Sequence, residues 1–355
     1  MKASRLFVLF LLFSSLDCVA AGLDGSVVWS KIGPHLEVAN DQVWNVKALP
    51  AGRGEPRSFR FYALRFHLGY YQLKLVDVGE FARSKAESIA RDQNVDKTLP
   101  AVFELGLRTI FKINPFSEKI VAAAPAGFPT SSRNPTNLGL LKIDGVERFK
   151  LVSKGPSAVF CLDNPPQGSS GYEYQIPTFF RTSVQSNLID GCRDEVQTGP
   201  RILEDPSRFR VQQFDADSTT VETYRRKIDG REEAVPVYLG IPDTPPNYVK
   251  YLRAAFAVDD PGRISDQNKE RDVARNAYII VTTTPAGFWD LQDMFKSPEF
   301  YANEHYAPHW AINLPGDDYA ALVHVKSLPG EGANTTEIGS VTLRQATVLA
   351  VVVRK

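Results

Sequence analysis

The sequence predicts an α+β fold, with a mixed or antiparallel sheet, flanking helices and one elaborated domain. Three observations support this fold class. Short apolar or alternating runs outnumber helical ones, tight turns rich in glycine, proline and aspartate separate these runs, and no internal repeat occurs. The chain has 355 residues, which is long enough to bury a large core.

The first 21 residues have the pattern of a cleavable signal peptide. Lys2 and Arg5 precede the apolar run Leu6–Phe13, and the small residues Val19-Ala20-Ala21 follow before Gly22. The apolar run is shorter than the roughly 20 residues that a membrane-spanning helix needs. We therefore expect a secreted or periplasmic protein whose mature form has no membrane span.

The N-terminal third of the mature chain is predicted to be mostly strands. Residues 22–58 contain scattered glycine and proline and are interpreted as short strands and loops. The runs at 59–68 and 70–78 flank Gly69 and predict a hairpin. Residues 79–92 contain many good helix formers and predict a helix. From residue 59 to residue 355 we expect a single domain.

The middle of the chain alternates between strands and breaks. The buried run 120–124 ends at Pro125-Ala126-Gly127-Phe128-Pro129, and the next strand, 138–143, ends at Asp144-Gly145. Residues 157–162 are strand-like, and 196–203 has the pattern of a strand with a backbone break in its middle. The charged, proline-rich stretch 204–262 is interpreted as an insertion.

The C-terminal third again shows regular patterns. Residues 288–294 predict a helix, and the turn Pro315-Gly316-Asp317-Asp318 separates two apolar strands. The strands expected in this third are 277–282, 310–314, 319–325 and 346–353.

Charge and cysteine content restrict the function classes. The chain has 41 basic and 41 acidic side chains, which argues against a nucleic-acid partner and against binding to anionic lipid. Without Cys18, which lies in the predicted signal peptide, Cys161 and Cys192 remain as a pair. In an exported protein such a pair predicts one disulfide, and two buried free thiols are the alternative.

Several familiar catalytic sites are absent from the sequence. It contains no phosphate-binding glycine loop, no Gly-x-Ser-x-Gly and no His-Glu-x-x-His, and we expect neither a cofactor nor a metal. Asp317 and Asp318 lie in a tight turn between apolar strands, where carboxylates and backbone amides can bind a ligand. Ordinary turn chemistry is the alternative for both residues.

Several segments occur in an order similar to that of the phosphodiester glycosidase family, which is related to the mannose-6-phosphate uncovering enzyme. Residues 121–129 resemble a strand ending in Asn-Gly-Gly-Phe-Phe, and residues 136–145 resemble the strand and turn after it. Residues 196–203 resemble a Gln-Ser-Gly-Pro-Arg-Leu element. Glu270-Arg271-Asp272-Val273 resembles an Arg-Thr-Ala segment, and 288–325 resembles a helix leading into Ala-Leu-Asn-Leu-Asp-Gly-Gly-Gly-Ser.

The resemblance implies a carbohydrate or glycosyl-phosphate ligand and a set of site residues. The implied catalytic residues are Asp317, Asp318 and Arg271, with Arg271 and Arg201 as guanidinium clamps for a phosphate. The implied substrate-binding residues are Gly127, Gly199, Arg201, Asn313 and Gly316.

The sequence departs from the family at polar positions. Pro125 stands where the family has Asn, Pro315 stands where it has Asp, and Asp317, Asp318 and Tyr319 replace Gly, Gly and Ser. A proline side chain offers neither a hydrogen bond nor acid or base function. Two functions therefore follow from the sequence: a glycosyl-phosphodiester hydrolase acting on surface or secreted glycans, or a catalytically inactive glycan-binding or glycosyl-phosphate-binding envelope protein of the same fold.

Overall fold

The computed structural model describes most of the chain after residue 25. The described residues are 26–47, 57–84, 106–116, 118–130, 136–152, 156, 158–163, 176–181, 192–204, 221–228, 231–238, 251–259, 276–302, 306–328 and 334–354. The predicted signal peptide and Arg271 lie outside these residues. The predicted helix at 79–92 is described only as far as residue 84, and residues 78–84 are helical.

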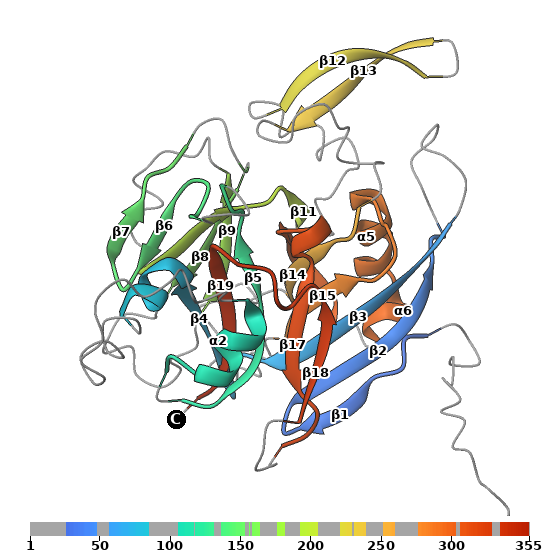
Figure 1. The fold of residues 1–355 in the computed structure, drawn as a ribbon. Coiled ribbons are helices and arrows are strands. Elements are labelled where there is room, and N and C mark those ends of the chain that lie inside the picture. Colours follow the sequence, from blue (N-terminus) through green and yellow to red (C-terminus); the bar gives the residue numbers. More distant parts are fainter. Residues whose placement is uncertain are drawn as a thin grey trace, which may run out of the picture.

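Antiparallel sheets dominate the fold, as predicted (Figure 1). The largest sheet has seven strands in the order β1-β2-β3-β15-β14-β16-β11. Its strands are β1 (Ser30–Gly33), β2 (Leu36–Asn45), β3 (Ser58–His67), β11 (Arg201–Glu204), β14 (Ala254–Asp259), β15 (Asn276–Thr282) and β16 (Pro308–Leu314).

Two five-stranded sheets complete the body of the molecule. One has the order β18-β17-β5-β19-β4 and contains β4 (Tyr71–Asp77), β5 (Ile120–Gly127), β17 (Ala321–Val325), β18 (Thr335–Gly339) and β19 (Thr347–Val353). The other has the order β7-β6-β10-β8-β9 and contains β6 (Leu141–Ile143), β7 (Val146–Phe149), β8 (Ala158–Asp163), β9 (Ile176–Arg181) and β10 (Asp194–Thr198).

The predicted insertion at 204–262 contributes to two different sheets. β12 (Val221–Ile228) and β13 (Arg231–Tyr238) pair with each other as a two-stranded antiparallel sheet. β14, at the C-terminal end of the same stretch, pairs with β15 and β16 inside the seven-stranded sheet. The end of this stretch is therefore part of the central architecture.

The helices are short and pack beside the sheets (Figure 1). α5 (Phe288–Phe295), which the sequence predicted, contacts β11 and the one-turn helix α6 (Pro298–Tyr301). α2 (Leu107–Ile113) contacts β5 and β17 of a five-stranded sheet. A short 3-10 helix, η2 (Asp317–Tyr319), lies in the turn between β16 and β17.

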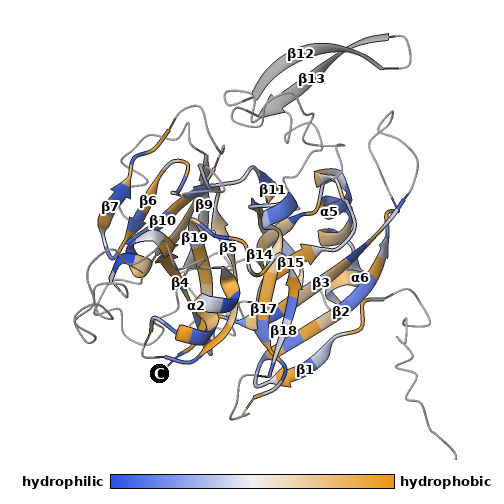
Figure 2. Cartoon of the chain, in the orientation of Figure 1, coloured by the Kyte–Doolittle hydropathy of each residue, from blue (hydrophilic) through white to orange (hydrophobic). Residues whose placement is uncertain are grey.

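The seven-stranded sheet is buried on both faces, and this explains its nearly continuous apolar strands. Along β15, Ile279 and Val281 belong to the core shared with the other sheets, whereas Tyr278 and Ile280 belong to the core beneath α5 and α6. Successive side chains of a strand point to opposite faces, so both sets must be apolar. Figure 2 shows hydrophobic residues along the inner strands and hydrophilic ones on edge strands such as β7 and β18.

The predicted hairpin at 59–78 is wrong. β3 and β4 follow each other in the chain, but β3 pairs with β2 and β15, whereas β4 pairs with β19 in another sheet. Both strands are largely apolar, so each can be covered on two faces and can accept partners from distant parts of the chain. The short turn at Gly69 therefore connects two sheets.

Candidate functional site

The candidate site is considered around three strands, each from a different sheet, that contact one another. β5, β10 and β16 contact each other although each belongs to a different sheet. The first residues at or after these strand ends include Gly127, Gly199 and Gly316, which the sequence analysis had proposed for the site. Loops that leave the ends of packed strands are common positions for binding and catalytic residues.

Gly127, the last residue of β5, is in close contact with the buried side chain of Asn137. A Cβ at position 127 would lie 1.6 Å from Oδ1 of Asn137, so only glycine fits there without movement. The Asn137 amide donates to the carbonyls of Gly139 and Leu140, at 3.0 and 3.1 Å, and its Oδ1 accepts from the Thr347 hydroxyl at 3.2 Å. Asn137 therefore ties the loop after β5 to β19.

Gln197, in β10, has a fully hydrogen-bonded and completely buried amide. Its Oε1 accepts from the backbone amides of Leu140 and Val152, each at 3.0 Å. Its Nε2 donates to the carbonyls of Val152 and Pro156, each at 2.8 Å. These four bonds use the whole capacity of the side chain. Gln197 therefore joins two loops to the strand that leads into Gly199.

Gly199 and Asn313, both proposed for the site, are in direct contact. The Gly199 amide donates to the Asn313 carbonyl at 2.9 Å, and the Asn313 side-chain amide donates to the Gly199 carbonyl at 3.3 Å. The peptide bond between Gly199 and Pro200 is cis, and this is the predicted break between β10 and β11. Arg201, in β11, is buried and pairs with Ile312 of β16.

The turn after β16 presents two carboxylates to solvent. A Cβ at Gly316 would lie 2.6 Å from the carbonyl oxygen of Leu252, and the Asp317 amide donates to the same oxygen at 2.7 Å. Asp317 has a positive φ of 53°. Asp317 and Asp318 are exposed, and Tyr319 is half-buried. The turn is therefore held against the segment that contains Leu252.

Arg253 supplies a buried positive charge beside this turn. Its guanidinium lies 4.1 Å from the ring centroid of Phe288 and 5.1 Å from that of Tyr251, and its Nε donates to the Ala286 carbonyl at 3.0 Å. Burial lowers the pKa of Arg253 to about 10, although Asp317, Tyr251 and Asp290 act in the opposite direction. The side chain remains a cation at neutral pH.

The Asp317 carboxyl has a raised pKa. Partial burial is the main cause, the charge of Arg253 opposes it, and the charge of Asp318 adds to it. Such a carboxyl keeps its proton to a higher pH than an ordinary aspartate does.

The structure brings some of the proposed residues together. Gly199 contacts Asn313 directly, and Gly316 and Asp317 follow on the same strand end. Arg201 is buried in β11, and Gly127 contacts Asn137 and Val196, the residue before Gln197.

Arg253 is the charged residue that the sequence analysis missed. It lies in the stretch that we had interpreted as an insertion, directly before the buried strand β14. The segment Arg253-Ala254-Ala255 shares its first and third residues with Arg-Thr-Ala, the pattern that we had assigned to Arg271. An arginine immediately before an apolar strand was therefore the available signal.

The two prolines at polar family positions are both buried. Pro125, in β5, is paired with Val348 of β19 next to a shift in register. The pairing of β5 with β17 ends at Ala123, so the missing N–H of Pro125 falls beyond that ladder. Pro315 is the first residue after β16. Neither proline can take part in acid or base chemistry.

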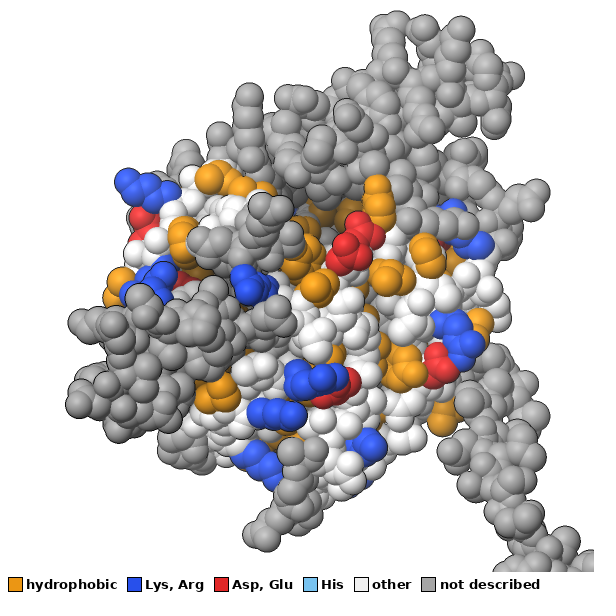
Figure 3. All heavy atoms as spheres, viewed as in Figure 1, with side chains coloured by type: hydrophobic (Ala, Val, Ile, Leu, Met, Phe, Trp, Pro, Cys, Tyr) orange, Lys and Arg blue, Asp and Glu red, His pale blue; other side chains and the backbone are white. Residues whose placement is uncertain are grey.

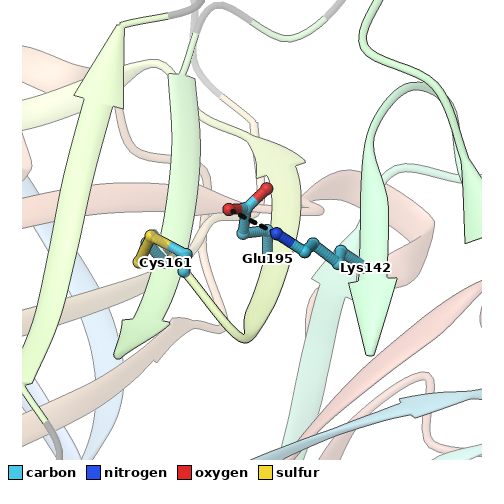
Figure 4. Close-up of a disulfide and its surroundings, with 4 residues drawn as sticks. Lys142, Cys161 and Glu195 are labelled. Carbon is cyan, nitrogen blue, oxygen red and sulfur yellow. Dashed lines mark ion pairs between the residues drawn. A yellow bond between two sulfur atoms is a disulfide. The ribbon is translucent and has the colours of Figure 1, made fainter. Parts of the chain in front are cut away.

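The predicted disulfide is present. Cys161, in β8, is bonded to Cys192, just before β10, and the Cα atoms are 5.9 Å apart. Figure 4 shows the disulfide near the ion pair of Lys142 and Glu195, whose Nζ and Oε1 atoms are 3.8 Å apart. Glu195 is opposite Cys161 in the register of β8 and β10. The bond therefore fixes the strand that carries Gln197.

The surface in view shows mixed charge. In Figure 3, the basic, acidic and hydrophobic side chains of the described residues are interspersed with neutral ones. Among the helices that the structure describes, none has both the length and the apolar character needed to cross a bilayer.

Comparison with known proteins gives distant structural similarities. Neither a family model nor a curated protein matches the sequence. The catalytic domain of zebrafish N-acetylglucosamine-1-phosphodiester alpha-N-acetylglucosaminidase, auto-inhibited by its pro-peptide, is 12% identical with a TM-score of 0.49, over 93% of this chain and 89% of that one.

Two bacterial structures are also similar. A hypothetical protein from Synechocystis is 12% identical with a TM-score of 0.43, over 90% of this chain and 62% of that one. A Burkholderia pseudomallei protein thought to be exported is 10% identical with a TM-score of 0.43, over 83% of this chain and 74% of that one. At these identities and TM-scores, the similarities identify neither a family nor an activity for the chain.

Proposed function

We propose that this protein is an exported hydrolase that cleaves sugars from glycosyl phosphodiesters. The observation that carries the proposal is the exposed Asp317 carboxyl, which has a raised pKa and lies close enough to the buried Arg253 to interact with its charge. A carboxyl that keeps its proton can donate it to a leaving oxygen. The sequence resemblance to phosphodiester glycosidases and the predicted signal peptide agree with such a substrate.

In the proposed reaction, the bond between the anomeric carbon and the phosphate oxygen breaks. Asp317 donates its proton to the leaving phosphate oxygen, and a water molecule attacks the anomeric carbon. Asp318, the other exposed carboxyl of the turn, takes the proton that this water loses. The products are the free sugar and a phosphate monoester. Arg253, which is buried, acts through Asp317 by favouring its ionised form after the proton has left.

The test is sugar release from a panel of synthetic glycosyl phosphodiesters between pH 4 and pH 8. Asp317→Asn is expected to lower kcat at least about 100-fold, because general acid catalysis contributes that much. Asp144→Asn is a matched control, since Asp144 is also an exposed aspartate with a positive φ but lies in the turn after β6. Equal loss of activity in both variants would contradict the assignment of Asp317.

A catalytically inactive glycan-binding protein is the second candidate function. It is favoured by Pro125 and Pro315, which replace the Asn and Asp of the resembled family with buried side chains that have no polar group. For this function we expect no sugar release from any diester by the unmodified protein. Binding of the same diesters, measured by calorimetry, would then remain and would decrease in Asp317→Asn.

A further inference from the structure

Tyr251 is a half-buried aromatic residue beside the Asp317 turn. It directly precedes Leu252, whose carbonyl accepts the hydrogen bond from the Asp317 amide at 2.7 Å. The next residue is Arg253, whose charge interacts with both Asp317 and Tyr251. The ring therefore belongs to the short segment that fixes the turn, and Tyr251 as a residue is only half-buried.

The Tyr251 ring is held in place before any ligand arrives. Its backbone amide donates to the Ala286 carbonyl at 3.2 Å, and its carbonyl accepts from the Ala286 amide at 2.8 Å. The Arg253 guanidinium lies 5.1 Å from its ring centroid, in a cation–π contact. Arg253 is in turn fixed by its bond to Ala286 and its contact with Phe288. A preorganised ring binds a ligand without losing much side-chain freedom.

The groups around Tyr251 indicate the class of ligand. Tyr251 and Tyr319 are half-buried, and Asp317 and Asp318 are exposed. A sugar ring combines an apolar C–H face with hydroxyl donors, so it complements an aromatic face next to hydrogen-bond acceptors. We propose that Tyr251 is the platform on which the sugar ring of the ligand lies, beside Asp317. This inference rests on the proposed function, because it assumes that the ligand carries a sugar.

A purely structural role for Tyr251 makes a different prediction. If the ring only covers Arg253, its removal lowers stability and leaves sugar affinity unchanged. If the ring stacks on the sugar, its removal weakens sugar binding, and another aromatic ring at the same position restores it. Tyr251→Phe retains the ring and loses the hydroxyl, whereas Tyr251→Leu retains apolar volume and loses the ring.

The experiment measures binding of methyl glycosides of the common hexoses and N-acetylhexosamines by NMR titration, so it does not depend on hydrolysis. We expect binding by the unmodified protein, a dissociation constant within about threefold for Tyr251→Phe, and binding at least about tenfold weaker for Tyr251→Ala and Tyr251→Leu. Tyr70→Ala is the control, because Tyr70 is 49% exposed and stacks on His35 at another turn.

The outcomes separate this inference from the proposed function. Absence of binding by the unmodified protein, or affinity within twofold for Tyr251→Leu, would overturn the inference. Ring-dependent sugar binding without cleavage of any diester would support the inference and reject the hydrolase. Cleavage with an unchanged KM in Tyr251→Leu would support the hydrolase and reject the sugar platform.

Discussion

The loops around Gln197 and the turn at Asp317 use polar residues in opposite ways. Around Gln197, buried amides are paired with other groups of the same chain: Asn137 and Gln197 together make six hydrogen bonds to backbone groups and one to the Thr347 hydroxyl. In the turn, the carboxyls of Asp317 and Asp318 are exposed, and the interaction with Arg253 is one of charge. Polar groups saturated by the protein build a scaffold, whereas exposed ones remain available to a ligand.

The largest expected effect on stability comes from removing the hydrogen bonds of the Gln197 side chain. Gln197→Leu leaves the backbone groups of Leu140, Val152 and Pro156 without their partner, and we expect a loss of about 4 kcal/mol in the free energy of unfolding. Gln345 is also completely buried, but none of the described residues gives its amide a hydrogen bond. Gln345→Leu is therefore expected to be neutral or stabilising by about 1 kcal/mol.

Both variants are measured by urea unfolding. Equal destabilisation by the two substitutions would show that the hydrogen bonds of Gln197 do not account for its contribution to stability.

Removing the disulfide is expected to have a similar or slightly smaller effect. Cys161 and Cys192 are 31 positions apart, and a loop of this length contributes about 3 to 4 kcal/mol through the entropy of the unfolded chain. The double variant Cys161→Ala, Cys192→Ala should lose this amount in unfolding experiments without reductant. Reductant breaks the disulfide of the unmodified protein, so the stability of that protein should then fall to about that of the double variant. A difference that stays the same size in reductant would contradict the loop-entropy explanation.

A methyl group at Gly127 tests the contact between β5 and Asn137. Gly127→Ala should destabilise the protein by about 1 to 3 kcal/mol, because the new Cβ overlaps Oδ1 of Asn137. In the double variant with Asn137→Ala the overlap is absent, so the two losses should sum to more than the measured total. Strictly additive losses in thermal unfolding would show that the two residues do not meet.

The smallest effect on stability is expected from substitutions at Arg253 and in the Asp317 turn. Arg253→Met removes the cation that favours ionised Asp317, so the pKa of Asp317 should rise further. NMR titration of the carboxyl measures this shift, and a fall in the pKa would contradict the assigned interaction.

The sign of the corresponding pH dependence follows from linkage. The folded-state pKa of Asp317 is above its unfolded value, so this residue supports folding at low pH and loses that contribution as pH rises through the folded-state pKa. Asp317→Asn removes this slope from the pH profile of the unfolding free energy, and Arg253→Met extends it to higher pH.

Local patterns predicted the fold class and many of the strands, because burial imposes a regular apolar pattern on each strand. The break at Gly199-Pro200, the helix after Gly287 and the disulfide also followed from local residue types. Strand partners did not: β3 pairs with β15, more than 200 positions away, and nothing in either sequence specifies this partner.

Site residues that the backbone requires, such as glycines at close contacts, could be predicted from the sequence. Side chains that meet from distant segments were predicted less well. Glycine at 127 and 316 reflects close contacts that only glycine permits, and both positions were proposed. Arg253 was missed because its interaction with Asp317 joins segments 64 positions apart. The role of Gln197 was also hidden, because Val152 and Pro156 are more than 40 positions away from it.

The position of β19 in its sheet has a consequence for how the chain folds. This strand contains some of the last residues of the sequence, yet it lies between β4 and β5 and pairs with both. Until it is added, β4 and β5 are not neighbours in a sheet, so this sheet is completed only when residues 347–353 have joined it. Contacts between segments so far apart in the sequence imply slow folding, with this sheet formed late.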